Sequence, residues 1–217
     1  MRALLLCLIL LVAACDGGEP PESLVDEELA PVDVVQQWLA AVDEVDVEQL
    51  EVLVEPVGLA VLAGVENQTR SIELAGLVES GIAGRLADSY WRSFRDDFET
   101  LRGIDFGAIT VGEQLTTRQS SDHVAVEIMG PEQSAVVSLR NSEPGGWQVD
   151  MVATVGAGLA GPLRQYLESA LEGDYSESIA DAYRSAVVPG LDAAIALNPD
   201  EALLVFETEL IRQLVTS

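Results

Sequence analysis

The alternation of apolar and polar residues predicts helices in the first part of the chain after residue 30. From Pro31 onward, apolar residues recur every three or four positions, which is the spacing of an amphipathic helix. A short second helix is expected from Asp46, because Gln49 three positions later completes a capping box. Residues 57–84 predict two short helical pieces, and residues 86–101 predict a longer amphipathic helix.

The period of the pattern changes to two in the middle of the chain, which predicts β-strands. Four stretches alternate or are rich in β-branched residues, namely 109–117, 123–129, 134–140 and 147–155. The loops between them are too short for the crossover that parallel neighbours require, so we expect an antiparallel meander. His123 is expected to be exposed at the start of its strand, because neighbouring Asp122 points to the opposite face and cannot orient it.

The last quarter of the chain is helical again. Apolar stripes over 163–171 and 179–187 predict two helices, and Pro189 with the glycine after it is expected to break the chain. Asn198 is expected to cap a last helix that has a proline in its first turn. These stripes need an apolar surface to cover, which we expect to be the second face of the sheet or a partner.

Helices followed by a four-stranded meander predict an α+β fold. The chain here resembles the NTF2-like, or SnoaL-like, cone domains over residues 31–155. The resemblance is carried by the opening helices, QQWLAAVDEVDVEQLEVL, and by the closing strand, GGWQVDM. It is nearest to uncharacterised lipoproteins of high-GC bacteria that have such a domain. The resemblance implies helices packed on a curved antiparallel sheet of about four strands that encloses a pocket.

The first 15 residues form a separate signal. Arg2 precedes an apolar stretch of 12 residues, Ala3 to Ala14. A bilayer-spanning helix needs about 20 residues, so the length indicates a secretory leader instead. The end of the stretch, LVAAC, resembles a bacterial lipobox. That resemblance implies cleavage before Cys15 and acylation of this cysteine, with palmitate among the expected acyl groups, and two or three acyl chains hold a protein on a membrane.

We expect four segments. They are a lipoprotein signal peptide (1–14), an acidic tether rich in glycine and proline (15–30), an NTF2-like α+β domain (31–172) and a C-terminal helical extension (173–217). The tether is too polar to bury a core, so it is expected to be solvated.

The composition excludes several classes of function. The chain has 37 acidic residues against 11 arginines and no lysine, and its formal charge is -26. Nucleic-acid binding is excluded, because it requires a cationic face. The absence of lysine excludes a P-loop and a pyridoxal phosphate Schiff base. One histidine, with no thiol left after processing, makes no zinc or iron site of the usual kind. We expect no cofactor and no metal.

Residues 156–161 read G-x-G-x-x-G, the pattern of a dinucleotide-binding loop. The strand before this pattern closes a meander and opens no βαβ unit, and Pro162 follows the third glycine. A flexible exit from the last strand is therefore expected in place of a nucleotide site.

If the cone is hollow, six residues are expected to line its pocket. They are Trp38, Trp91, Phe94, Glu127, Trp147 and Asp150. A wall of aromatic and aliphatic groups with few polar ones suits a small apolar or amphipathic ligand.

Three hypotheses of function follow. The first is a membrane-anchored envelope lipoprotein, held at the outer face of the cytoplasmic membrane or elsewhere in the envelope, that binds a small ligand or an envelope protein and is no enzyme. The second is an enzyme similar to ketosteroid isomerases or polyketide cyclases, in which Glu127 or Asp150 is the pocket base. The third is a structural module whose C-terminal helices mediate assembly.

Overall fold

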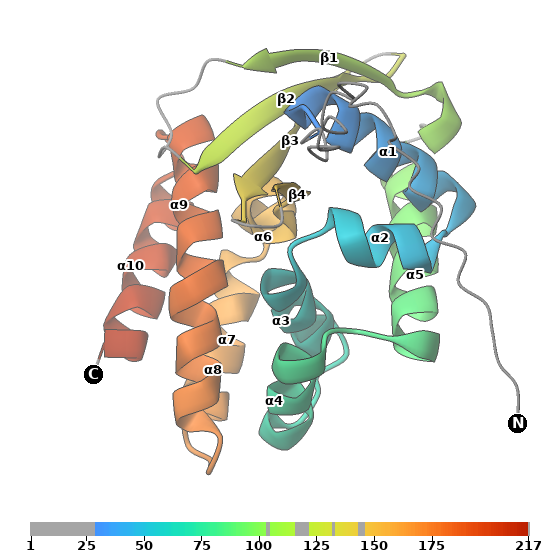
Figure 1. Cartoon of the computed structure of the whole chain (residues 1–217). Helices are drawn as coiled ribbons and strands as arrows, with labels where there is room; N and C mark the ends of the chain where they lie inside the picture. The colour runs from blue at the N-terminus through green and yellow to red at the C-terminus, as the bar shows by residue number, and fades with distance from the viewer. Residues whose placement is uncertain (1–28, 103–104, 116–121, 132, 143–145, 217) are drawn as a thin grey trace, which may run out of the picture.

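The computed structural model describes residues 29–102, 105–115, 122–131, 133–142 and 146–216. The leader, with Cys15, and most of the tether lie outside the described residues. In chain order the elements (Figure 1) are α1 (Pro31–Glu44), α2 (Val47–Leu53), α3 (Pro56–Glu66), α4 (Ser71–Ser80), α5 (Gly84–Arg102), the 3-10 turn η1 (Phe106–Ala108), β1 (Thr110–Leu115), β2 (His123–Met129), β3 (Ser134–Asn141), β4 (Trp147–Val149), α6 (Met151–Val155), the 3-10 turn η2 (Gly156–Gly158), α7 (Ala160–Ala170), α8 (Ser176–Ala182), the π-helical turn η3 (Tyr183–Val187), α9 (Val188–Leu197) and α10 (Ala202–Thr216).

The predicted helix starts in the first part of the chain are confirmed. Pro31 occupies the first turn of α1, where its missing N–H leaves no hydrogen bond unmade. Val45 ends α1 in the left-handed region, with φ of 56°. The carboxylate of Asp46 then accepts a hydrogen bond of 3.2 Å from the backbone N–H of Gln49 and caps α2. The two helical pieces expected over 57–84 are α3 and α4.

The four strands form one antiparallel sheet in the order β1-β2-β3-β4, as the short loops predicted. The register between β2 and β3 places His123 opposite Arg140 and Ala125 opposite Ser138. These four side chains therefore share one face of the sheet. The α+β class and the meander are confirmed.

Helices cover both faces of this sheet. The N-terminal helix α1 packs against β1, β2 and β4, and α6 packs against β3 and α9 (Figure 1). On the α6 side, the Arg140 guanidinium of β3 donates a hydrogen bond of 2.7 Å to the carbonyl oxygen of Ser185 in η3. The helix α6 thus covers the second face, and the C-terminal helices pack mainly against helices, α9 against α6 and η3 against α3.

One hydrophobic core runs through the domain. Among its fully buried members, Trp91 and Leu139 belong to the first part of the described chain, and Tyr183, Leu191 and Ile211 belong to the last. Residues after 173 therefore contribute to the same core as residues 31–172, and the expected boundary separates no second core.

The last strand is shorter than expected, because a cap ends it. Only Trp147–Val149 is extended, and the Oδ1 of Asp150 accepts a hydrogen bond of 2.8 Å from the N–H of Ala153 to start α6. The prediction of a strand through Val155 was wrong. A short run of branched residues fits a buried helix as well as a strand, and the cap decides between them here.

Two expectations for the C-terminal helices were also wrong. Pro189 breaks nothing, since the chain runs from α8 through η3 into α9. Proline has no N–H for the carbonyl four residues before it, and that carbonyl, of Ser185, accepts from Arg140 instead. Asn198 is the C-cap of α9, and its amide Nδ2 donates to the carbonyl of Ala194. The last helix, α10, begins at Ala202.

Candidate functional site

One opening in the described part of the chain is a groove of about 450 Å³ between α3, α5 and the segment that joins α6 to α7. We refer to it as the α3–α5 groove. Its lining residues are Leu62, Val65, Glu66, Tyr90, Phe94, Asp97, Phe98, Val155, Leu159 and Pro162. Seven of these ten side chains have no polar atom, so the wall is mainly apolar.

Aromatic rings hold the α5 wall of the groove in place. The centroid of Phe94 lies 5.7 Å from that of Trp91, 6.2 Å from that of Trp38 and 6.1 Å from that of Phe106. Phe98 packs on Phe106 at 4.7 Å between centroids. Because edge and offset ring contacts of this kind fix orientation, α5 presents a preformed surface to the groove.

Three of the lining residues have polar side chains, namely Glu66, Asp97 and Tyr90. The pKa of Glu66 is raised, first because its carboxyl is partly desolvated and then because Asp97 repels its charge. Tyr90 is only 8% exposed. Within the part of the chain that the structure describes, its hydroxyl has no hydrogen-bond partner.

A second group of polar residues is buried under the sheet on the α6 side. The Nε2 of His123 lies 3.1 Å from the Oδ2 of Asp150, and the two residues are 4% and 1% exposed. The expectation of an exposed His123 was wrong. The Oδ1 of Asp122 also lies 3.9 Å from the Nδ1 of His123. Asp122 stands in the turn before β2, where strand alternation does not apply, so it can face the same ring.

Glu55 joins this buried group from the start of α3. Its carboxylate accepts hydrogen bonds from the N–H groups of Val57 at 3.0 Å and of Gly58 at 2.6 Å. The pKa of Glu55 is raised: burial raises it most, the two backbone bonds lower it, Asp150 raises it and Arg140 lowers it. The His123–Asp150 contact thus links β2 to the cap of α6, and the backbone N–H of Glu55 donates to the carbonyl of Val149 at 3.0 Å, which links the start of α3 to β4.

The buried group does not have the form of an open catalytic site. Both oxygens of Asp150 are engaged, one by His123 and one by the N–H of Ala153. Asp150 lines none of the grooves described here. A base for proton abstraction must lie within hydrogen-bond reach of a substrate, so this carboxylate is placed for structure.

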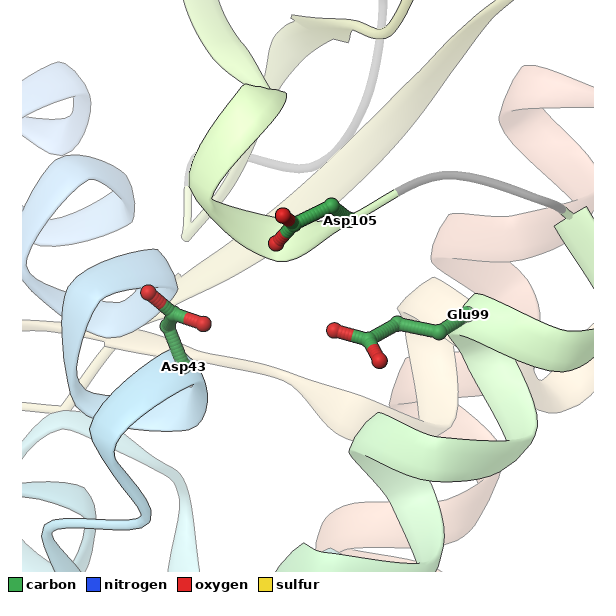
Figure 2. A group of neighbouring side chains, drawn as sticks. All are labelled: Asp43, Glu99 and Asp105. Atoms are coloured by element: carbon green, nitrogen blue, oxygen red, sulfur yellow. The ribbon is translucent and has the colours of Figure 1, made fainter.

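A third group consists of three carboxylates that converge near the start of η1. Figure 2 shows Asp43 of α1, Glu99 of α5 and Asp105 pointing toward one another, and one oxygen of each lies within 4.8 Å of the others. Asp105 also accepts a hydrogen bond of 3.0 Å from the N–H of Gly107. Carboxylate oxygens are ligands for hard cations, but Asp43 and Asp105 are exposed, so water screens their repulsion without an ion.

The structure does not bring the six predicted pocket residues into one cavity. Phe94 lines the α3–α5 groove, and Trp91 lines a smaller groove of about 270 Å³ beside Ile82. Trp38 is buried against Phe94. The remaining three lie elsewhere: Trp147 is half-buried on β4, Glu127 is half-buried on β2, and Asp150 is buried with His123.

The sequence reasoning missed Tyr90, Asp97 and Glu66. A signal was available for the first two, since they stand four residues before and three residues after Phe94 and so share its helix face. Nothing in the local pattern connects Glu66 or Pro162 to that face. The glycines at 156–158 form η2 between α6 and α7, so the expected exit from the last strand was wrong, because this run follows a helix. The strand before the glycines that a dinucleotide-binding loop requires is not found at this place.

Comparison with known proteins identifies no relative. No family model, no curated protein and no solved structure matches the chain. Among the described residues, no helix is long and apolar enough to cross a membrane.

Proposed function

We propose that this protein is a lipid-anchored envelope protein whose folded domain binds a small apolar or amphipathic ligand in the α3–α5 groove. The observation that carries the proposal is the groove itself. Its volume of about 450 Å³ falls in the range of small-molecule sites, roughly 300–1,000 Å³. A mostly apolar wall with a few convergent polar groups is also typical of such sites.

The anchor part of the proposal is supported by the leader. A short apolar stretch that ends in LVAAC resembles a lipobox, and it would place the acyl chains on Cys15. The acidic tether after it, with 37 acids in the whole chain against 11 arginines, would keep the domain away from anionic head groups. Cys15→Ser should release the protein from the membrane fraction of the cell. Sedimentation of this variant with membranes would contradict the anchor.

We also propose that the domain is a variant of the NTF2-like cone. Support comes from the element order, with helices first and a four-stranded antiparallel sheet after them, and from α1 packing along the sheet. In this chain α6 covers the other face of the sheet, and α9 packs on α6. The proposed ligand groove therefore lies among the helices.

Binding can be tested with the neutral fluorescent probe N-phenyl-1-naphthylamine and the chain from residue 16, which omits the leader and Cys15. All core residues lie between Val34 and Val215, so this chain retains the whole core. We expect saturable binding with enhanced emission. Val155→Trp fills the groove and should abolish the signal, whereas Val52→Trp, at an exposed site on α2, should leave it unchanged. Equal binding by both variants would place the probe elsewhere and contradict the proposal.

The two other hypotheses are less supported. The enzyme hypothesis requires Asp150 or Glu127 in an apolar pocket, and neither lines the α3–α5 groove. The assembly hypothesis has one observation in its favour, since Leu203 and Phe206 are 67% and 58% exposed on α10. Nothing in the structure indicates what would cover them.

A further inference from the structure

The α3–α5 groove is negatively charged and has no internal compensation. Its lining includes two carboxylates, Glu66 from the end of α3 and Asp97 from α5, and no arginine or histidine. Among the described residues, neither carboxylate forms an ion pair or a hydrogen bond. The neighbouring residue on α5 differs, because Asp96 is paired with Arg95 at 2.9 Å.

The aromatic residues that line the groove can also attract a positive charge. Tyr90, Phe94 and Phe98 line the groove, and aromatic faces attract cations within about 6 Å of the ring centre. Tyr90 is a buried residue of the groove wall, and its hydroxyl has no hydrogen-bond partner among the described residues, so it can accept a hydrogen bond from an N–H donor. A ligand there meets carboxylates, ring faces and a hydroxyl together.

The following inference rests on the function proposed above. We propose that the ligand of the α3–α5 groove is an organic cation, with an amine or ammonium group on an apolar body. The cationic head lies between Glu66 and Asp97, and the apolar body lies against Phe94, Val155 and Leu159. Such a head would relieve the repulsion between the two carboxylates, which is one cause of the raised pKa of Glu66.

A divalent metal ion fits this groove less well. Calcium takes six to eight oxygen ligands and magnesium requires octahedral oxygen geometry. Here two carboxylates and one hydroxyl stand on a wall of hydrocarbon, so most of the coordination sphere would have no protein ligand. The same hydrocarbon wall favours an organic cation, because its apolar part gains free energy by leaving water.

The test is a set of three probes with one apolar body and different charge. They are 1-naphthylmethylammonium, neutral 1-naphthylmethanol and anionic 1-naphthylacetate, and each is titrated calorimetrically into the chain from residue 16. Glu66 and Asp97 are exposed, so each ion pair contributes little by itself. We expect the ammonium to bind about tenfold more tightly than the alcohol, from the two ion pairs and the aromatic rings together. The acetate should bind most weakly.

Variants separate the local charge from the charge of the whole chain. Glu66→Gln with Asp97→Asn should bring the ammonium affinity down to that of the alcohol and leave the alcohol unchanged. The control, Glu79→Gln with Asp200→Asn, removes the same net charge at two exposed sites outside the groove and should change neither.

The outcomes distinguish the two proposals. If the alcohol binds and the ammonium binds no more tightly, the groove is a ligand site and the cation inference is wrong. An equal loss of ammonium affinity in both double variants also overturns the cation inference, because the attraction would then come from the net charge of the chain. If none of the three probes binds, the proposed function of the groove is wrong.

Discussion

The close contact between α6 and α9 gives a stability prediction with a definite sign. Gly190 lies in α9 where the helix crosses α6. A Cβ at this position would stand 2.8 Å from the Cβ of Val152 and 3.0 Å from the Oδ1 of Asp150. The first of these atoms is attached directly to the backbone of α6, so no side-chain rotation can move it. Gly190→Ala must therefore push the two helices apart.

The size of the effect follows from two opposing contributions. Overpacking a dense core costs about 1–3 kcal/mol, and the contact with a backbone-attached carbon points to the upper part of that range. Alanine is preferred over glycine inside a helix by about 1 kcal/mol, which offsets part of the loss. We expect Gly190→Ala to lower the free energy of unfolding by about 2 kcal/mol, or Tm by about 4–8 °C for a chain of this size.

A second glycine provides the matched control. Gly76 is in the middle of α4, and a Cβ there would meet no atom within 4 Å. Gly76→Ala should gain only the helical preference and raise the free energy of unfolding by about 0.5–1 kcal/mol. Thermal and urea unfolding followed by circular dichroism measures both variants. If Gly190→Ala is as stable as the parent, the close crossing of α9 over α6 does not exist in solution.

Two further predictions concern the buried polar group. Glu55→Gln should change how stability depends on pH. Because the pKa of Glu55 is raised in the folded state, the folded protein binds this proton more tightly than the unfolded chain does. The resulting stabilisation of the fold is fully present below the ordinary pKa of 4.5 and is lost as pH rises through the raised pKa. Glutamine does not titrate, so the free energy of unfolding of Glu55→Gln minus that of the parent should rise between pH 4 and pH 7 in urea titrations. If this difference is the same at all pH values, Glu55 has no raised pKa. Ser138→Ala should stabilise the fold by about 1 kcal/mol, because the Ser138 hydroxyl is fully buried without a hydrogen-bond partner among the described residues; a loss of stability in the same titration would mean that the hydroxyl is paired.

Local signals in the sequence were sufficient for most helices and for the sheet. These signals involve residues only a few positions apart, as in the cap at Asp46, the proline at 31 and the period-two stretches. They can therefore be recognised from the sequence without the tertiary structure. The antiparallel meander follows from loop length, which is also a local quantity. The expectation that the chain binds no nucleic acid rests on the charge of -26 and needs no coordinates.

The same local signals failed where a distant residue decides the outcome. Pro189 continues a helix because Arg140, far away in the sequence, donates to the carbonyl that the proline leaves without its usual N–H. His123 is buried because Asp150, 27 residues later in the chain, lies beside it. A polar group in the core is stable only if a partner is present, and the sequence does not show which partner folds next to it.

The candidate site depends on contacts between residues that are far apart in the sequence. The α3–α5 groove joins Glu66, the aromatic face of α5 and Pro162, which come from three separate parts of the chain. Each part reads as an ordinary amphipathic helix or turn, and the opening exists only because packing leaves space between them. The sequence by itself thus determined the class of fold, the charge and the expected anchor at Cys15, while the tertiary structure alone decided where two unpaired carboxylates meet an aromatic wall.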